Sequence, residues 1–221
     1  MNIAVDGPAG AGKSSIAKQV AKELSFVYVD TGAMYRTMAL FFMEQGISLE
    51  NEEEVSGHCK EIDIKLEYDN GTQVVLLNGR NVSEEIRREE VGNAASVVAK
   101  YSAVRSKLVA IQRKLAETTD LIMDGRDIGT VVLPNAEVKI YLTASTAVRA
   151  NRRFLELQGK GQEADLKKIE EDIIVRDKQD MNREISPLRQ ADDAVLVDSS
   201  DMTIDEVVGT IIKIVKECKK S

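Results

Sequence analysis

The sequence is poor in the residues that cross-link chains or bind zinc. Its 221 residues include two cysteines, Cys59 and Cys218, and a single histidine, His58. Because the cysteines lie far apart and the histidine has no second histidine to accompany it, neither a disulfide framework nor a zinc site is indicated. The sequence also lacks any apolar run of the roughly 18 residues that a membrane span requires.

The beginning of the chain lacks a basic segment followed by a long apolar one, and passes directly into the short apolar run of residues 3–5. We therefore find no secretory signal and expect a cytoplasmic protein. Lysines and arginines are fewer than aspartates and glutamates, which gives a formal net charge of −7. Domains that bind nucleic acids are usually basic, so this balance argues against that class. Arginines gathered in particular loops favour small phosphorylated ligands instead.

A glycine-rich loop at residues 7–14 matches the pattern G-x-x-x-x-G-K-[ST] and follows the first apolar run directly. Its glycines allow consecutive backbone N–H groups to curl around phosphate oxygens, and the following helix adds its positive N-terminal end. Lys13 is expected to reach the β- and γ-phosphates, and Ser14 to ligate Mg²⁺. The expected ATP-binding residues are Gly7, Pro8, Ala9, Gly10, Ala11, Gly12, Lys13, Ser14 and Ser15.

Apolar periodicity predicts an α/β fold with one main domain. Apolar runs that alternate with helical stripes indicate about five parallel strands with helices on both faces. Residues 62–68 alternate apolar and polar side chains, and an apolar run at 74–77 lies between the turn signals at 69–71 and 78–79, which predicts a small antiparallel three-stranded insert. We expect the core to span residues 1–45 and 84–221, and the insert residues 46–83. A capping box at residues 203–206 is expected to begin the last helix.

Ligands of such sheets bind at the carboxyl ends of the strands, so the loops at 7–14, 30–36, 124–129 and 198–200 are expected to share one rim. Asp124 ends an apolar strand there and is a candidate to hold Mg²⁺, directly or through water. A helix cap or a salt bridge to Arg126 is the alternative for this residue.

Arginines that could bind a second, acceptor phosphate are Arg36, Arg105 and Arg126, because guanidinium forks match phosphate oxygens. Arg105 flanks an apolar helical stripe and could equally be solvated. The spacing of Arg176, Asp180 and Arg183 puts them on one helical face, which an exposed ladder of salt bridges would also produce.

Three further arginines, Arg149, Arg152 and Arg153, are spaced so that they project toward one side of a helix. The helix precedes residues 158–162, where two glycines indicate a mobile loop. Such a cluster could stabilise charge on a transferring phosphoryl group, or it could be a plain surface patch.

The combination of motifs resembles the bacterial cytidylate kinases, nucleoside monophosphate kinases that transfer the γ-phosphate of ATP to CMP and dCMP. The most specific motifs are Thr-Gly-Ala-Met-Tyr-Arg at 31–36 and Asp-Gly-Arg-Asp at 124–127, together with the predicted insert. The resemblance covers essentially the whole chain, since residues 6–14, 85–87, 93–96, 128–130, 182–183 and 186–188 also fit it.

This resemblance implies a P-loop kinase fold, a phosphotransferase with a phosphate-group acceptor, and a set of binding residues. Thr31, which stands where many members have Ser, and Arg36 would contact the acceptor nucleotide, and Arg126 its phosphate. Ser96, Arg105 and Asp127 would read the cytosine edge. The pentose hydroxyls or nearby phosphate would be held by Asp180 and Arg183, with Arg176 in the same network.

Further implications concern catalysis and partners. The catalytic residues would be Lys13, Arg126, Arg152 and Arg153, acting with Mg²⁺. Residues 46–83 would form the monophosphate-binding insert, and residues from about 156 to 167 a lid. The expected partners are ATP and CMP or dCMP, without nucleic acid or membrane, and we expect a monomer.

Two other functions are compatible with the phosphate-binding loop itself. One is a kinase for another small acceptor, such as UMP or a non-nucleotide compound. The other is a nucleotide-gated switch without enzymatic activity. The guanine-specific form of such a switch is disfavoured, because the sequence contains no Asn-Lys-x-Asp or Thr-Lys-x-Asp run.

Overall fold

The structure, a computed structural model, describes residues 1–69 and 72–219. The chain divides into two compact units, the first formed by Met1–Phe26 and Leu121–Ser221 and the second by Val27–Asp120. The first contains β1 (Asn2–Asp6), α1 (Lys13–Leu24), β6 (Leu121–Gly125), η3 (Ile128–Val132), β7 (Val138–Thr143), α6 (Thr146–Gly159), α7 (Leu166–Asn182), β8 (Val195–Asp198) and α8 (Ile204–Cys218). The second contains β2 (Val27–Asp30), α2 (Thr31–Glu44), α3 (Glu52–His58), η1 (Cys59–Glu61), β3 (Ile64–Asp69), β4 (Thr72–Leu77), β5 (Arg80–Asn81), η2 (Glu85–Arg87), α4 (Glu89–Val98) and α5 (Ser102–Thr118).

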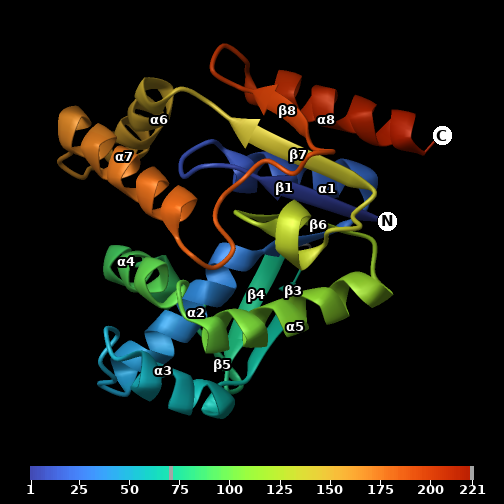
Figure 1. The fold of residues 1–221 in the computed structure, drawn as a ribbon. Coiled ribbons are helices and arrows are strands. Elements are labelled where there is room, and N and C mark those ends of the chain that lie inside the picture. Colours follow the sequence, from blue (N-terminus) through green and yellow to red (C-terminus); the bar gives the residue numbers. More distant parts are fainter. Residues whose placement is uncertain (70–71, 220–221) are drawn as a thin grey trace. The chain divides into compact units, whose positions relative to one another are not determined.

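The main sheet has five strands, four of which belong to the first unit in the order β6-β1-β7-β8. Within the first unit β1 pairs in parallel with β6 and with β7, and β7 pairs in parallel with β8 (Figure 1). Ile3, Ala4 and Val5 are completely buried, as expected of a strand covered on both faces. The predicted parallel sheet of an α/β fold is therefore confirmed.

The parallel register places functional segments at one edge of this sheet. Val5 pairs with Asp124, so the loop after β1 and the loop after β6 leave the sheet at the same level. Gly7 begins the first of these loops with φ of 150°, and a Cβ at this position would lie 1.9 Å from the carbonyl oxygen of Leu142 in β7. The loop can begin here only because residue 7 has no side chain.

The last helix, α8, begins as predicted. The Thr203 side chain accepts a hydrogen bond from the backbone N–H of Glu206, and the Glu206 carboxylate accepts one from the N–H of Thr203, which completes the capping box. The apolar face of α8 is buried, and the helix contacts α1 and β7 (Figure 1). The buried residues of this face are Val207, Val208, Ile211, Ile212 and Val215.

In the second unit, the antiparallel order β3-β4-β5 confirms the predicted three-stranded sheet. Asn70 and Gly71, in the predicted turn between the first two of these strands, lie outside the described residues. The sheet falls within the second unit, and the role of residues 46–83 in binding a monophosphate stays a prediction.

Three local features of the second unit differ from what the sequence pattern indicates. The pattern indicates a helix from Gly32 or Ala33, but α2 begins at Thr31, because the Asp30 carboxylate accepts a hydrogen bond from the N–H of Ala33 and caps the helix. The pattern also indicates helix over residues 83–100, but this segment is divided into η2 and α4. Helix α3 was not predicted, since Val55 is its one buried residue and seven residues are too few to show a periodic apolar face.

Within the part of the chain that the structure describes, no helix combines the length and apolar character needed to cross a membrane.

The close approach of Gly7 to β7 gives a test of this architecture. Replacing Gly7 with Ala is expected to lower the free energy of unfolding by about 3 kcal/mol or to disrupt the loop, because the new methyl group overlaps backbone that cannot rotate away. Gly209→Ala is the matched control: no atom lies within 4 Å of a Cβ there, and the helix should gain about 0.5 to 1 kcal/mol. Urea denaturation of both variants measures the difference, and equal stabilities would contradict the close approach of Gly7 to Leu142.

Candidate active site

The phosphate-binding loop holds its lysine in a buried position. The Nζ atom of Lys13 donates a hydrogen bond of 2.7 Å to the carbonyl oxygen of Pro8 across the loop. Gly10 and Gly12 have φ values of 75° and 88°, which turn the backbone into the left-handed region. Burial lowers the pKa of Lys13 well below its ordinary value, and the nearby Arg126 lowers it further. Phosphate oxygens beside the ammonium group would favour its charged form.

Ser14 and Asp124 meet at the base of this loop. The Ser14 hydroxyl donates to the Asp124 carboxylate at 2.8 Å, which joins the first turn of α1 to the end of β6. A hydroxyl and a carboxylate are hard oxygen ligands of the kind that Mg²⁺ prefers, so this pair fits the ion. Among the described residues no group of three or more His, Cys, Asp or Glu could hold a metal by itself.

Asp6 is a residue to which the sequence assigns no role. Its carboxylate accepts hydrogen bonds from the backbone N–H of Ile128 at 2.8 Å and of Gly129 at 2.7 Å. These bonds tie the end of β1 to the turn that follows Arg126 and Asp127. Burial nevertheless raises the pKa of Asp6 to about 6, because the two backbone donors only partly offset the loss of water. Its position could have identified Asp6 in the sequence, because it is a charged residue at the end of an apolar strand.

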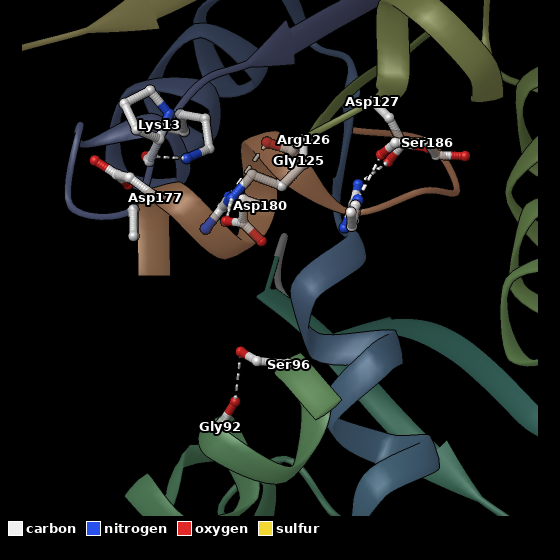
Figure 2. A network of polar contacts seen from close by, with 12 residues as sticks. Lys13, Gly92, Ser96, Gly125, Arg126, Asp127, Asp177, Asp180 and Ser186 are labelled. Carbon is white, nitrogen blue, oxygen red and sulfur yellow. Dashed lines mark hydrogen bonds and ion pairs between the residues drawn. The ribbon is translucent and has the colours of Figure 1, made fainter. Parts of the chain in front are cut away.

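Arg126 and Asp180 form a partly buried ion pair beside Lys13 (Figure 2). The Arg126 Nε atom donates to the Asp180 carboxylate at 2.7 Å. Burial opposes the charge of Asp180, but Arg126, Arg176 and Arg183 outweigh it and hold its pKa below the ordinary value. Asp124 is bonded to Ser14, and Arg126 to Asp180. On α7, Arg176 and Asp180 are only partly exposed, so this face of the helix is not a fully solvated ladder of salt bridges.

Asp127 and Arg183 lie close to one another in the same unit. An Arg183 Nη atom is 3.5 Å from the Asp127 carboxylate. The Nε atom of the same guanidinium donates to the backbone carbonyl of Ser186, just after α7. Asp127 is 4% exposed, so this contact with Arg183 lies largely out of water.

The three arginines of α6 have separate partners. Arg152 donates to the backbone oxygen of Ser199 at 2.7 Å, and Arg153 pairs with Glu156 on its own helix at 2.9 Å. Arg149 is 4% exposed, and its guanidinium is engaged by the protein itself. The spacing of the three arginines predicted the side of the helix on which they lie, but it could not predict the acceptor of each guanidinium.

In the second unit, Asp30 faces two arginines. Its carboxylate oxygen Oδ2 lies 3.6 Å from an Arg36 Nη atom and 3.5 Å from an Arg87 Nη atom, while Oδ1 caps α2. Thr31, the first residue of the helix, is 3% exposed. Arg87 has no assigned role in the sequence, although its motif carries part of the family resemblance.

Arg105 and Ser96 lie on α5 and α4 of the second unit. Arg105 is 4% exposed, so the solvated alternative is wrong. Its guanidinium lies 5.6 Å from the centre of the Tyr35 ring and donates to the carbonyl of Ala99 at 3.4 Å. The Ser96 hydroxyl donates to the carbonyl of Gly92 at 3.3 Å (Figure 2).

Comparisons with known proteins agree over nearly the whole chain. The family model described as cytidylate kinase matches residues 3–217. Cytidylate kinases of Bacillus cereus (strain ATCC 10987 / NRS 248) and Bacillus thuringiensis (strain Al Hakam) are each 51% identical over 215 residues, which cover 97% of this chain and 96% of theirs.

Solved structures of two other kinases share the fold. A gluconokinase from Sinorhizobium meliloti 1021 has a TM-score of 0.51 at 14% identity, covering 99% of this chain and 94% of its own. Shikimate kinase from Bacteroides thetaiotaomicron has a TM-score of 0.50 at 11% identity, covering 98% of each chain. At these identities the likeness is one of fold alone.

The raised pKa of Asp6 leads to a pH-dependent prediction. The folded chain should hold the Asp6 proton more tightly than the unfolded chain between pH about 4 and about 6. Ionisation of Asp6 should therefore lower the free energy of unfolding as pH rises through this window, with the full effect above pH 6. An NMR titration of the side-chain carboxyl carbons should show the Asp6 midpoint near 6.

Asp193 serves as an internal control for that titration. Its hydrogen bond with Lys139 holds its pKa below the ordinary value, so its midpoint should lie at lower pH. An Asp6 midpoint at or below that of Asp193 would contradict the proposed cost of burial.

Proposed function

The chain belongs to the cytidylate kinase family, and on this premise we propose that it transfers the γ-phosphate of ATP to CMP or dCMP, forming ADP and CDP or dCDP. The observation that carries the proposal is the match of the cytidylate kinase family model to residues 3–217. The phosphate-binding loop, in which Lys13 bonds to Pro8 and Ser14 to Asp124, supports the use of a nucleoside triphosphate as donor. The relatives do not favour transfer to another acceptor or a purely regulatory role.

On the donor side, we propose that the backbone N–H groups of residues 7–15 bind the phosphates of ATP. Lys13 would exchange its hydrogen bond to Pro8 for contacts with the β- and γ-phosphates. Ser14 and Asp124 would hold Mg²⁺, directly or through water, and the ion would neutralise charge on the phosphate oxygens. Arg152 and Arg153 would stabilise the transferring group after releasing their present partners.

On the acceptor side, Arg126 would bind the phosphate of CMP. Asp180 holds its Nε atom, which leaves other guanidinium N–H groups for phosphate oxygens. Asp127 would accept a hydrogen bond from the exocyclic amine of cytosine, which uracil lacks. The other residues proposed to bind CMP are Arg176, Asp180 and Arg183 in the first unit and Thr31, Arg36, Ser96 and Arg105 in the second.

The proposed mechanism depends on position and charge more than on a base. Two anionic substrates repel each other, so the chain must supply positive charge and align the attacking oxygen with the γ-phosphate. Water must be excluded, since it would otherwise receive the phosphoryl group. We propose that one chain suffices for this reaction.

A side-by-side assay of phosphate transfer to CMP, UMP and AMP tests the proposal. CMP should be the best acceptor, and Asp127→Ala should lower the ratio of kcat/KM for CMP to that for UMP by about 10-fold or more, because a buried partner of the amine is lost. Asp192→Ala, a change at an exposed aspartate, is the matched control and should leave the ratio unchanged. UMP preferred by the unaltered chain would reject the assignment of substrate, and no transfer to any monophosphate would favour the regulatory role.

Arg126→Ala tests the acceptor side separately from the donor side. The substitution should lower kcat by about 100-fold or more, as expected when a donor to developing charge is removed. ADP binding, measured by calorimetry, should stay close to that of the unaltered protein. Arg189→Ala removes an exposed arginine and provides the control. A loss of ADP affinity as large as the loss of turnover would show that Arg126 serves the donor instead.

A further inference from the structure

The Arg149 guanidinium has more partners within the protein than we expect of an arginine that contacts a substrate. Its Nε atom donates to the carbonyl of Ala144 at 2.9 Å, and an Nη atom donates to Thr146 Oγ1 at 3.2 Å. The same Nη atom lies 2.7 Å from the Asp177 carboxylate of α7. The remaining Nη atom donates to the carbonyl of Ala9 at 2.8 Å. A guanidinium with four acceptors around its five N–H groups has little capacity left for a substrate.

The bond to Ala9 bears on the shape of the phosphate-binding loop. In a planar trans peptide the C=O and the N–H point in opposite directions. Because Arg149 holds the Ala9 carbonyl toward α6, the N–H of Gly10 in the same peptide must point away from α6. A loop that binds phosphate works by aiming consecutive N–H groups at the anion.

Packing at Gly10 supports the same role of Arg149 in shaping the loop backbone. A Cβ at Gly10 would lie 3.3 Å from the Cβ of Arg149, so the loop backbone rests directly on the stem of this side chain. The φ of 75° at Gly10 is disfavoured for residues with a side chain. The stem and the guanidinium of Arg149 thus contact two successive residues of the loop from one side.

Asp177 holds the guanidinium in this position. Its Oδ2 atom pairs with Arg149, while Oδ1 is buried without a hydrogen-bond partner among the described residues. A carboxylate with one unused oxygen is stabilised chiefly by the ion pair, which makes Arg149 and Asp177 dependent on each other.

We propose that Arg149 is a positioning residue for the donor site: it orients the Ala9–Gly10 peptide so that the Gly10 N–H faces the phosphates, and Asp177 fixes Arg149 in turn. The inference deepens the proposed function, on which it rests only in taking ATP as the ligand of the loop. Arg149 itself then makes no contact with ATP.

The experiment compares ADP binding by calorimetry for Arg149→Met, Arg149→Lys and Asp177→Asn in the full chain. Arg149→Met should weaken ADP about 10-fold or more, as expected when a charge-assisted hydrogen bond is lost. Arg149→Lys should lose nearly as much, because an ammonium group cannot hold Ala9 and Asp177 together in the geometry of a fork. Asp177→Asn should change ADP binding in the same direction by a smaller factor. Lys213→Met, an exposed change on α8, is the control.

A spectroscopic readout separates positioning from general destabilisation. In ligand-free Arg149→Lys, the amide resonance of Gly10 should shift, while that of Gly209 in α8 should not. CMP binding should change less than twofold. If Arg149→Met does not fold, Arg149→Lys and Asp177→Asn decide the question.

The proposal is overturned if the folded Arg149 variants bind ADP within twofold of the unaltered protein, or if the Gly10 resonance is unchanged. These outcomes are independent of the acceptor. Failure of the unaltered chain to phosphorylate CMP would reject the proposed function, whereas ADP binding by the loop would still report on Arg149.

Discussion

Positive charge held out of water is the constraint on which the first unit depends. Lys13 and Arg149 are buried and Arg126 is partly buried, and each would be costly there without an acceptor. The chain meets this cost with carboxylates on one helix: Asp177 pairs with Arg149, and Asp180 with Arg126. Lys13 instead uses a backbone carbonyl, and burial lowers its pKa. Helix α7 therefore serves as a counter-charge for the loop and for the end of β6.

The ion pair of Arg126 with Asp180 has a functional consequence, because it holds the guanidinium in place while occupying only part of its N–H groups. A phosphate that approached Lys13 or Arg126 would meet a side chain that the fold has already removed from water, and it would favour the charged form of Lys13. The attraction is stronger than it would be in water, and little rearrangement is required. Arg149 differs, since its donors are taken up by the protein, and its charge is used to shape the loop.

The sequence predicted those parts of the fold that depend on local pattern. The phosphate-binding loop, the parallel strands, the three-stranded sheet and the cap at Thr203 follow from spacings of glycines, apolar residues and capping side chains. The partners of long side chains could not be predicted in this way. Arg149, Arg152 and Arg153 share one helical spacing, yet their acceptors differ. Arg149 donates to the loop after β1, Arg152 donates to the residue after β8, and Arg153 pairs within its own helix. Asp6 was overlooked because its donors are backbone groups more than a hundred residues away.

The close approach of Gly10 to the Arg149 side chain couples two positions that are far apart in the sequence. A side chain at residue 10 would need space that the arginine stem now fills, and a shorter residue at 149 would leave the loop without its support. Neither position can be varied alone at low cost, so a search for altered donor preference should randomise them together. Single-site libraries at residue 10 would sample mostly defective loops.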